Sequence, residues 1–599
     1  MTILQSLDRY YDRMAARDEA EAPGYSREKI SFAIVLSRAG EPIDKIDVRE
    51  QSGAKLRPRQ MEVPAAVKRT AGISPNLLWD KSAYVLGRTA SEGRRTADEH
   101  AAFKTANLAI LADTKDEGLV ALRRFLEAWT PGRFDSAPFA GEMLDANLVF
   151  RLEGDRGFIH EREAARRLLA NQAPDDGACG FCLITGIEAP LQRLHPTIKG
   201  VEGAQSSGAA LVSFNLDAFT SYGKEQGDNA PTSQAAAFRY GAALNRMLDR
   251  GGANRLPRPI GDATVVFWAD AEGASEDAAR AAEELFGGWF SPPVAENKSG
   301  KLDRDEGEAA KLREALRDVA VGRPLKEIDP KLTDDVRFHV LGLSPNAARL
   351  SVRFWIEDSF EVFAKRLAEH YEDLNIEPAP WRGALPAVQW LLVKTTALRE
   401  KFDNIPHALA GEVMRSILTG GPYPRTLLAS VIIRLRAGDD PASGWHAAAI
   451  RAVLARDKRL KHQREETPVS LDKANPNPAY QLGRLFAAME TAQRQALGNV
   501  NATIRDRYFG AASSAPATIF PLLWQGVQNH LGKLRKSGKG GWIEREIEEI
   551  VDRLEPQLPR ALPLEAQGRF AIGYYHQRKA QFAGRPVEAI ETEGEADDE

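Results

Sequence analysis

The residue types best suited to metal or redox chemistry meet at one place in the sequence. Cys179 and Cys182 form a CxxC pair, and His195 follows thirteen residues later. Structural zinc takes four ligands, so His195 and a further group would have to complete the set. The flanking residues lack the strand-to-helix setting of a redox CxxC. We favour a turn with two buried thiols, and we predict neither a metal nor a cofactor.

A second segment with reactive side chains is Gly203-Ala204-Gln205-Ser206-Ser207-Gly208. Its spacing differs from the G-x-S-x-G nucleophile elbow, and no partnered base and acid accompany it. Glycines let a backbone approach a ligand closely, and Gln and Ser form hydrogen bonds without charge, as in contacts to DNA. The alternative is a turn network in which these side chains satisfy buried backbone groups. Composition alone leaves the two interpretations about even.

Other catalytic patterns are missing from the sequence. It contains no GxxxxGK[ST] phosphate loop and no HExxH pair. A two-metal nuclease needs several clustered acids, and no such set can be named. The sequence therefore predicts a protein that is not an enzyme.

Residues 68–80 form a polar loop marked by Gly72 and Pro75. Its cations, Lys68 and Arg69, could neutralise phosphates, and Asn76 could hydrogen-bond a base edge. Trp79 could stack or act as a wedge. For Trp79 we favour burial in the core.

Two basic clusters occur in the last third of the chain. The first contains Arg451, Arg456, Lys458, Arg459, Lys461 and Arg464, and the second contains Lys533, Arg535, Lys536 and Lys539. Either cluster could follow a phosphate backbone, although basic solvated helical faces are common. Residues 381–480 hold 15 Lys and Arg against 9 Asp and Glu, so the net charge of −4 hides a basic region.

Length and composition predict a multidomain globular protein. A chain of 599 residues exceeds one hydrophobic core, and two to four domains are expected. No run of eighteen apolar residues predicts a membrane span, and two cysteines favour a reducing compartment, so we expect a cytoplasmic protein. Residues 588–599 carry seven acids and no base, which predicts a disordered tail.

Hydrophobic patterning predicts the elements that position these side chains. Strands are expected over 30–36, 43–48, 148–152, 211–215, 264–268, 337–343 and 349–356. Helices are expected over 98–129 with a break near Gly118, over 161–169, from about Pro231, and over 359–374. Residues 291–309 are expected to form a loop. After Pro380 apolar residues recur at helical spacing, so the fold class is α+β: a mixed domain over 1–380 and a helical bundle over 381–587.

Several segments together resemble the large subunit of the type I-C CRISPR surveillance complex, Cascade. The strongest likeness lies in His195-Pro196-Thr197-Ile198-Lys199-Gly200-Val201, Gln205-Ser206-Ser207-Gly208, Val212-Ser213-Phe214-Asn215, Ser221-Tyr222-Gly223 and Asn229-Ala230-Pro231. Further likeness lies in Leu7-Asp8-Arg9-Tyr10-Tyr11, in Asn76-Leu77-Leu78-Trp79-Asp80 and in Leu343-Ser344-Pro345-Asn346.

The resemblance implies a non-catalytic subunit of a complex that carries CRISPR RNA. Such a subunit reads a protospacer-adjacent motif in double-stranded DNA, helps to open the duplex into an R-loop, and steadies the displaced strand. It works with backbone, RNA-processing and small subunits, and a recruited helicase-nuclease cuts. The family's helical end is also translated separately as the small subunit. Met489 would start such a product of 111 residues.

The resemblance and the residue types together nominate two sets of DNA contacts. The duplex set is Lys68, Arg69, Asn76, Lys199, Gln205, Ser206, Ser207 and Asn215, with Lys224 and Gln226 as possible neighbours. The displaced-strand set is Arg451, Arg456, Lys458, Arg459, Lys461, Lys533, Arg535 and Lys536. The competing hypotheses are a structural scaffold with little DNA contact, a nuclease or hydrolase that uses the Gln205-Ser206-Ser207 loop, and a general single-strand-binding protein.

Overall fold

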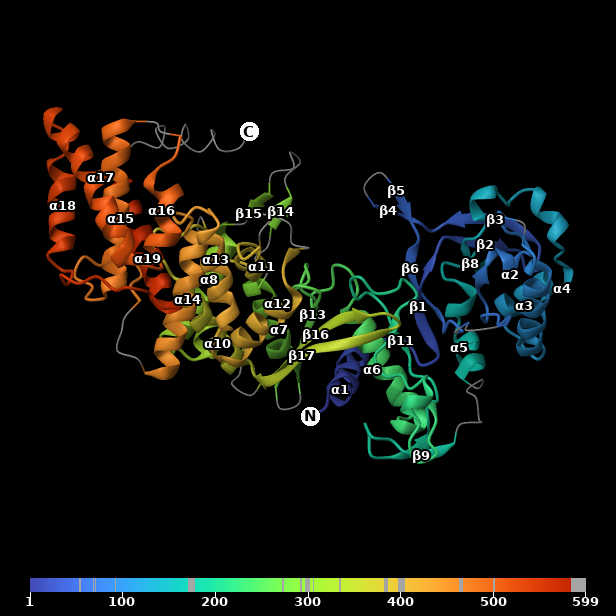
Figure 1. The fold of residues 1–599 in the computed structure, drawn as a ribbon. Helices are drawn as coiled ribbons and strands as arrows, with labels where there is room; N and C mark the ends of the chain where they lie inside the picture. Colours follow the sequence, from blue (N-terminus) through green and yellow to red (C-terminus); the bar gives the residue numbers. More distant parts are fainter. Residues whose placement is uncertain are drawn as a thin grey trace. The chain divides into compact units, whose positions relative to one another are not determined.

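The chain folds into two compact units (Figure 1). A computed structural model describes residues 1–52, 55–67, 69, 72–91, 93–170, 178–271, 274–290, 294–296, 302–304, 306–332, 336–381, 386–396, 404–462, 467–498 and 501–582. Unit 1 comprises residues 1–196 and 212–244, and unit 2 comprises 197–211 and 245–599. The predicted boundary at residue 380 falls inside unit 2. The α+β class is confirmed.

Unit 1 is built on a four-stranded sheet with the order β3-β2-β8-β7. These strands are β2 (Phe32–Leu36), β3 (Pro42–Asp47), β7 (Asp80–Lys81) and β8 (Asn147–Leu152). Every residue of β2 is buried, because alternate side chains enter cores on both faces of the sheet. Phe32 and Ile34 join one core and Ala33 joins the other. The predicted strands at 30–36, 43–48 and 148–152 are therefore confirmed.

Helices cover one core of this sheet. They include α2 (Ser82–Val85), α3 (Thr96–Leu111) and α4 (Glu117–Ala128). Between α3 and α4, Asp116 accepts hydrogen bonds from the N–H groups of Gly118 and Leu119 and so caps the start of α4. This cap explains the predicted break near Gly118.

Smaller elements complete unit 1. They are α1 (Ile3–Ala16), β1 (Tyr25–Ile30), β4 (Glu50–Ser52), β5 (Lys55–Arg57), β6 (Arg59–Pro64), α5 (Glu163–Ala170), β9 (Cys179–Phe181), β10 (Glu188–Pro190) and most of α6 (Gln234–Met247). Arg239 of α6 forms ion pairs with Asp8 and Asp12 of α1, at 2.7 and 2.6 Å. These pairs join the first helix of the chain to a segment more than two hundred residues later.

Unit 2 begins with a five-stranded sheet of order β11-β12-β17-β16-β13. The strands are β11 (Thr197–Ile198), β12 (Ala209–Ala210), β13 (Thr264–Asp270), β16 (Arg337–Asn346) and β17 (Arg349–Ser359). Helices α7 (Glu276–Phe290), α8 (Glu306–Ala320), α9 (Leu325–Ile328) and α10 (Phe360–Leu374) accompany it. Ser359 caps α10 by accepting the Val362 N–H, which ends the predicted strand and begins the predicted helix there.

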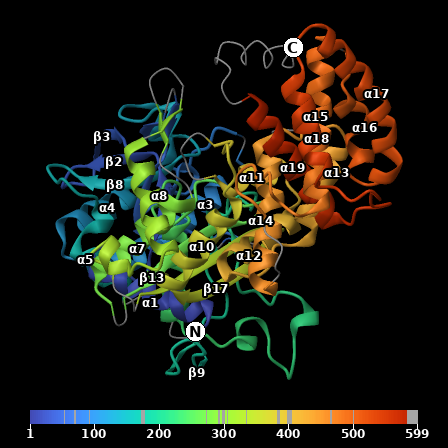
Figure 2. The same ribbon diagram turned by 90° about the vertical axis from the view of Figure 1, so that its left-hand side faces the viewer.

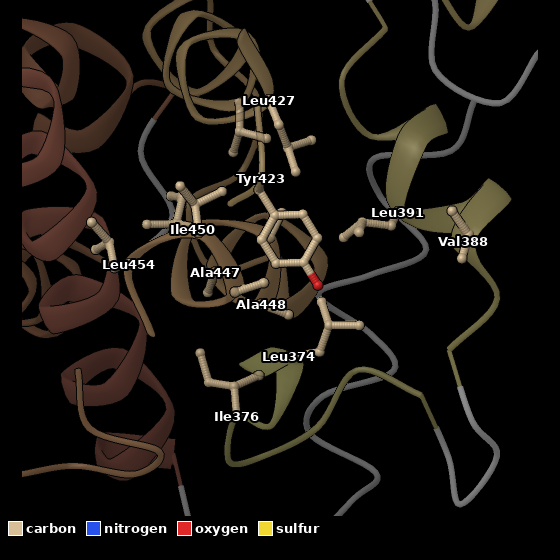
Figure 3. Packing of buried hydrophobic residues seen from close by; sticks show 14 of the residues in the cluster. Leu374, Ile376, Val388, Leu391, Tyr423, Leu427, Ala447, Ala448, Ile450 and Leu454 are labelled. Carbon is tan, nitrogen blue, oxygen red and sulfur yellow. The ribbon is translucent and has the colours of Figure 1, made fainter. Parts of the chain in front are cut away.

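The remainder of unit 2 is helical, as predicted. Its helices are α11 (Val388–Val393), α12 (His407–Thr419), α13 (Arg425–Arg436), α14 (Gly444–Lys461), α15 (Pro478–Leu497), α16 (Ile504–Ala512), α17 (Pro516–Lys536), α18 (Gly541–Val551) and α19 (Leu564–Phe582). One hydrophobic core runs from the sheet into these helices. Figure 3 shows Tyr423, Leu391 and Ile450 converging within it. This shared core explains why residue 380 does not separate the units.

Helices α15 and α19 are in close backbone contact at the C-terminal end of unit 2 (Figure 2). A Cβ added at Gly483 would lie 1.9 Å from the Phe570 carbonyl oxygen, and one at Gly573 would lie 2.1 Å from that of Tyr480. Only glycine allows two helices to approach so closely. The two glycines therefore define this helix pair.

Two predicted elements are wrong. Residues 211–215 form no strand, and the neighbouring strand is β12, whose pairing ends at Ala210. The predicted loop at 291–309 contains β14 (Val294–Glu296) paired with β15 (Leu302–Arg304) and the start of α8. In the first case the pairing of β12 with β17 depends on a distant segment, whereas β14 and β15 form a local hairpin inside the predicted loop. Among the described residues, no helix is long and apolar enough to cross a membrane.

Candidate nucleic-acid interface

Asn76 holds the polar loop of unit 1 together from inside. Its side-chain Oδ1 accepts the Val67 N–H at 2.9 Å, and its own N–H donates to Asp80 Oδ2 at 2.8 Å. Asn107 of α3 donates to its carbonyl oxygen at 3.2 Å. With only 4% of its surface exposed, Asn76 acts as a positioning residue and offers little to a base edge.

Arg69 is engaged in the same loop. Its Nε donates to the Ser74 carbonyl oxygen at 2.7 Å, and its Nη2 lies 2.5 Å from Asp80 Oδ2. Its guanidinium lies 4.1 Å from the centre of the Tyr84 ring. Burial raises the pKa of Asp80, against the hydrogen bond from Asn76 and the charge of Arg69. These contacts neutralise much of the charge that Arg69 could offer to a phosphate.

The rest of this loop supports a structural role. Trp79 is buried, as predicted, and its Nε1 donates to the Pro64 carbonyl oxygen at 2.7 Å. Lys68 lies outside the described residues. Arg69 and Asn76 are the predicted DNA contacts of this loop that the structure describes, and Arg69 is the more exposed of the two.

The segment Lys199–Gly208 connects β11 to β12 at the edge of the unit 2 sheet. Asn245 fixes its start, accepting the Lys199 N–H at 2.7 Å and donating to the Thr197 carbonyl oxygen at 3.2 Å. Gly208 closes the turn by donating to the Gln205 carbonyl oxygen at 2.8 Å. A Cβ at Gly208 would meet Thr197 and Ile198, so this glycine serves contacts within its own hairpin.

Three uncharged side chains project from this turn. Gln205, Ser206 and Ser207 are exposed, whereas Lys199 is half-buried. Asn215, Lys224 and Gln226 belong to unit 1, where Asn215 and Lys224 are exposed and Gln226 is half-buried. The structure thus brings Lys199 and the Gln-Ser-Ser segment together in one loop of unit 2.

In α14 the predicted cations form an internal ion-pair network. Arg456 has 0% exposure, and its Nε lies 2.5 Å from Asp373 Oδ2. Arg459 reaches the other Asp373 oxygen at 2.6 Å. Arg451 donates to the carbonyl oxygens of Glu372 and Asp373, at 2.6 and 2.8 Å. The predicted contacts of Arg451 and Arg456 with the displaced DNA strand are therefore wrong. Both residues fasten α14 to α10, and their buried guanidinium groups cannot contact DNA phosphates.

Two other α14 cations lie nearer the surface. Lys461 is exposed and pairs with Asp457 at 2.8 Å, and Lys458 is half-buried. Lys458 and Arg459 line a cavity of about 260 Å³ together with Arg451 and Thr467. Arg464 lies outside the described residues. The outer face of α14 is therefore less basic than its sequence suggests.

The second basic cluster is exposed. Lys533, Arg535 and Lys536 occupy the last turn of α17, and Lys539 follows in the turn to α18. Arg535 pairs with Glu544, Nε to Oε2 at 3.0 Å. Lys533, Lys536 and Lys539 present their charges to solvent, as a contact to phosphates requires.

One comparison with known proteins decides the family. A family model described as CRISPR-associated protein (Cas_Csd1) matches residues 7–582. The chain belongs to the Cas_Csd1 family. No curated protein matches it. Membership in the Cas_Csd1 family indicates a CRISPR-associated large subunit within a Cascade-type complex.

The cysteine segment of this Cas_Csd1 protein differs from the predicted turn with two buried thiols. Cys182 is buried, but Cys179 is exposed. Burial acts to raise the pKa of Cys182, yet hydrogen bonds from Ser233 and Thr185 lower it to about 7. His195 is buried, with Nδ1 2.7 Å from the Tyr240 hydroxyl. Within the described ranges no group of three His, Cys, Asp or Glu could hold a metal ion.

Sequence reasoning missed the aromatic residues that the Cas_Csd1 chain exposes. Trp524 and Trp542 are partly exposed on α17 and α18, with Trp542 three residues after Lys539, and Tyr222 is 99% exposed. The sequence does not distinguish them from buried aromatics: Trp524, for example, lies in helical register with the buried residues Phe520 and Val527.

Proposed function

We propose that this chain is the non-catalytic large subunit of a type I-C CRISPR RNA-guided complex. It recognises a protospacer-adjacent motif in double-stranded DNA, promotes duplex opening and R-loop formation, and steadies the displaced strand for a recruited helicase-nuclease. The observation that carries this proposal is the family match over residues 7–582. Its partners would be CRISPR RNA, target DNA and the backbone, RNA-processing and small subunits.

Motif recognition is assigned first to the β11–β12 turn. Guide pairing reads most of the target sequence in RNA-guided complexes, so the protein needs few contacts to bases. Gln205, Ser206 and Ser207 are exposed hydrogen-bonding groups on an anchored turn. Uncharged donors and acceptors suit a base edge, whereas cations serve mainly phosphates. Lys199 would contribute a phosphate contact beside them.

The displaced strand is assigned to the end of α17. Lys533, Lys536 and Lys539 are exposed within seven residues, at the turn that leads to α18. Exposed cations release counterions on binding DNA and so give a salt-dependent affinity. Trp542, which is 42% exposed at the start of α18, could stack an unpaired base beside them.

We also propose that the helical end is translated separately, from a start upstream of Met489. Met489 lies inside α15, so a product starting there would lack Pro478–Ala488. That segment carries Tyr480 and Gly483, which contact α19. A product that keeps α15 whole would have a mass above about 13 kDa, against about 12 kDa for the Met489 product. The intact mass of the fragment that co-purifies with the complex decides between them.

The test of the main proposal compares assembled complexes. We expect the complex without this chain to lose binding to target duplexes, and the Gln205→Ala/Ser206→Ala/Ser207→Ala variant to lose discrimination between DNA motifs. Lys326→Ala, an exposed change on α9 outside both nominated sets of DNA contacts, is the control. If the triple variant assembles poorly but still discriminates motifs, the chain is a scaffold. Hydrolysis by the isolated chain that depends on Ser206 would indicate an enzyme.

A further inference from the structure

Tyr222 occupies the tip of a tight turn in unit 1. The Lys224 N–H donates to the Ser221 carbonyl oxygen at 2.9 Å, and these two residues form an isolated β-bridge. The two residues between them are left-handed, with φ of +53° at Tyr222 and +72° at Gly223. Two consecutive left-handed residues are typical of a type I′ turn.

A tyrosine is an unusual choice for this position. The first central residue of a type I′ turn favours Asn, Asp or Gly, because a bulky L-residue at positive φ brings its Cβ against the backbone. Tyr222 makes no compensating core contact, since 99% of its surface is exposed. Strain at a position that gains nothing for the fold directs attention to binding.

The turn that presents Tyr222 is held firmly. Asn229 donates from Nδ2 to the carbonyl oxygens of Lys224 and Gln226, both at 3.2 Å. The Gly227 N–H donates to the Arg193 carbonyl oxygen at 3.0 Å, which ties the turn to the preceding segment of unit 1. A projecting ring on an anchored turn can be inserted into a partner without first being ordered.

The surroundings of the ring favour a nucleobase over an apolar protein surface. Ser221, Gly223 and Lys224 beside it are all exposed and are polar or small, and the next residue, Glu225, is also exposed. Protein anchors lie among apolar contacts that exclude water, whereas single aromatic rings next to a cation stack on bases or enter base steps.

We propose that Tyr222 stacks on a nucleobase of the target duplex at the point where its strands separate, with Lys224 near the adjoining phosphate. This inference rests on the proposed function and names a residue that performs the opening step.

The test uses the assembled complex and two targets. One target is fully paired, and the other carries a mismatched, already open segment beside the motif. A 2-aminopurine at successive positions reports unstacking by its fluorescence. Tyr222→Ala and Tyr222→Asn should slow opening of the paired target about tenfold, as loss of one stacked base implies. The open target should be bound as before, and Tyr222→Phe should behave like the unchanged protein.

Tyr222→Asn also separates function from folding. Asn suits a type I′ turn better than Tyr, so this variant should melt at the same or a higher temperature while opening DNA more slowly. The matched control is Phe181→Ala, since Phe181 is another exposed aromatic of unit 1, and it should leave opening unchanged.

Two results would overturn the inference. Wild-type opening of the paired target by the Tyr222→Asn variant would show that the ring does not stack on DNA. Loss of subunits from the Tyr222→Ala complex would instead make Tyr222 a protein anchor. Failure of the proposed function differs from both, because the complex lacking the whole chain would then open paired DNA normally.

Discussion

Helices α14 and α17 end in similar runs of cations, yet the structure uses them in opposite ways. Residues 456–461 of α14 and 533–536 of α17 each contain several Lys and Arg. Arg456 is enclosed by Asp373 and the Tyr423 ring, whereas Lys533 and Lys536 face solvent. A basic run in a helix therefore predicts either an internal clamp, formed here by Arg456 and Arg459 around Asp373, or an exposed basic face, and burial of the opposing acid distinguishes the two.

The largest effect should come from breaking the internal clamp. Arg456→Ala would leave the buried Asp373 carboxylate with Arg459 as its remaining ion-pair partner, and removing one partner of a buried pair costs about 3–5 kcal/mol. Urea denaturation should show this loss in the free energy of unfolding. Lys461→Ala, which removes an exposed pair with Asp457, should change that free energy by less than about 1 kcal/mol. Equal effects of the two changes would contradict the division into clamp and surface.

The next largest change in stability should come from the close contact between α15 and α19, compared with an open position on α17. Gly573→Ala would place a methyl group against the Tyr480 carbonyl oxygen and should destabilise the chain by about 1–3 kcal/mol. Gly526→Ala in α17 meets no atom within 4 Å and should stabilise the chain by about 0.5–1 kcal/mol, since Ala favours helix. Thermal melting of the two variants should therefore move in opposite directions.

Buried histidines of α10 and α19 should make unit 2 sensitive to acid. Burial lowers the pKa of His370 to about 3 and that of His576 to about 4, from an ordinary value of about 6.5. Below that ordinary value the unfolded chain binds protons that the folded chain does not, so stability should fall from about pH 6.5 to about pH 4. In His576→Gln, the slope of unfolding free energy against pH should be smaller over this range. An unchanged slope would show that His576 titrates normally.

The smallest effect on stability should come from the α17 surface. Lys533→Glu with Lys536→Glu should change the unfolding free energy by no more than about 0.5 kcal/mol per site. The same pair should weaken binding of the displaced strand and reduce the salt slope by about 0.7 for each lost phosphate contact. Lys461→Glu tests α14 in parallel. If Lys461→Glu weakened binding of the displaced DNA strand more than the Lys533→Glu/Lys536→Glu variant did, the assignment of that strand to α17 would fail.

Local sequence determined much of the fold. The β-branched run of β2, the Asp116 cap of α4 and the helical apolar spacing after Pro380 act within a few residues, so each could be predicted. Residues 211–215 were mispredicted, because the pairing of the neighbouring strand β12 with β17 depends on a distant segment. In 291–309 the polar composition concealed a local hairpin, in which Val294 pairs with Arg304. The candidate site was predicted less well: composition left the role of the Gln-Ser-Ser turn open, which the structure shows to be exposed, and the burial of Asn76 was not anticipated.

The sequence alone determined the fold class, the helical end and the resemblance to a CRISPR subunit. Hydrophobic periodicity and short sequence motifs depend only on the order of residues in the chain. Only the tertiary structure decided which polar residues face water. Arg456 and Lys533 are both cations on helices, and they differ because Asp373 of α10 lies opposite the first, while the second lies at an exposed helix end. Burial is set by what packs against a residue, and that partner can lie anywhere in the chain.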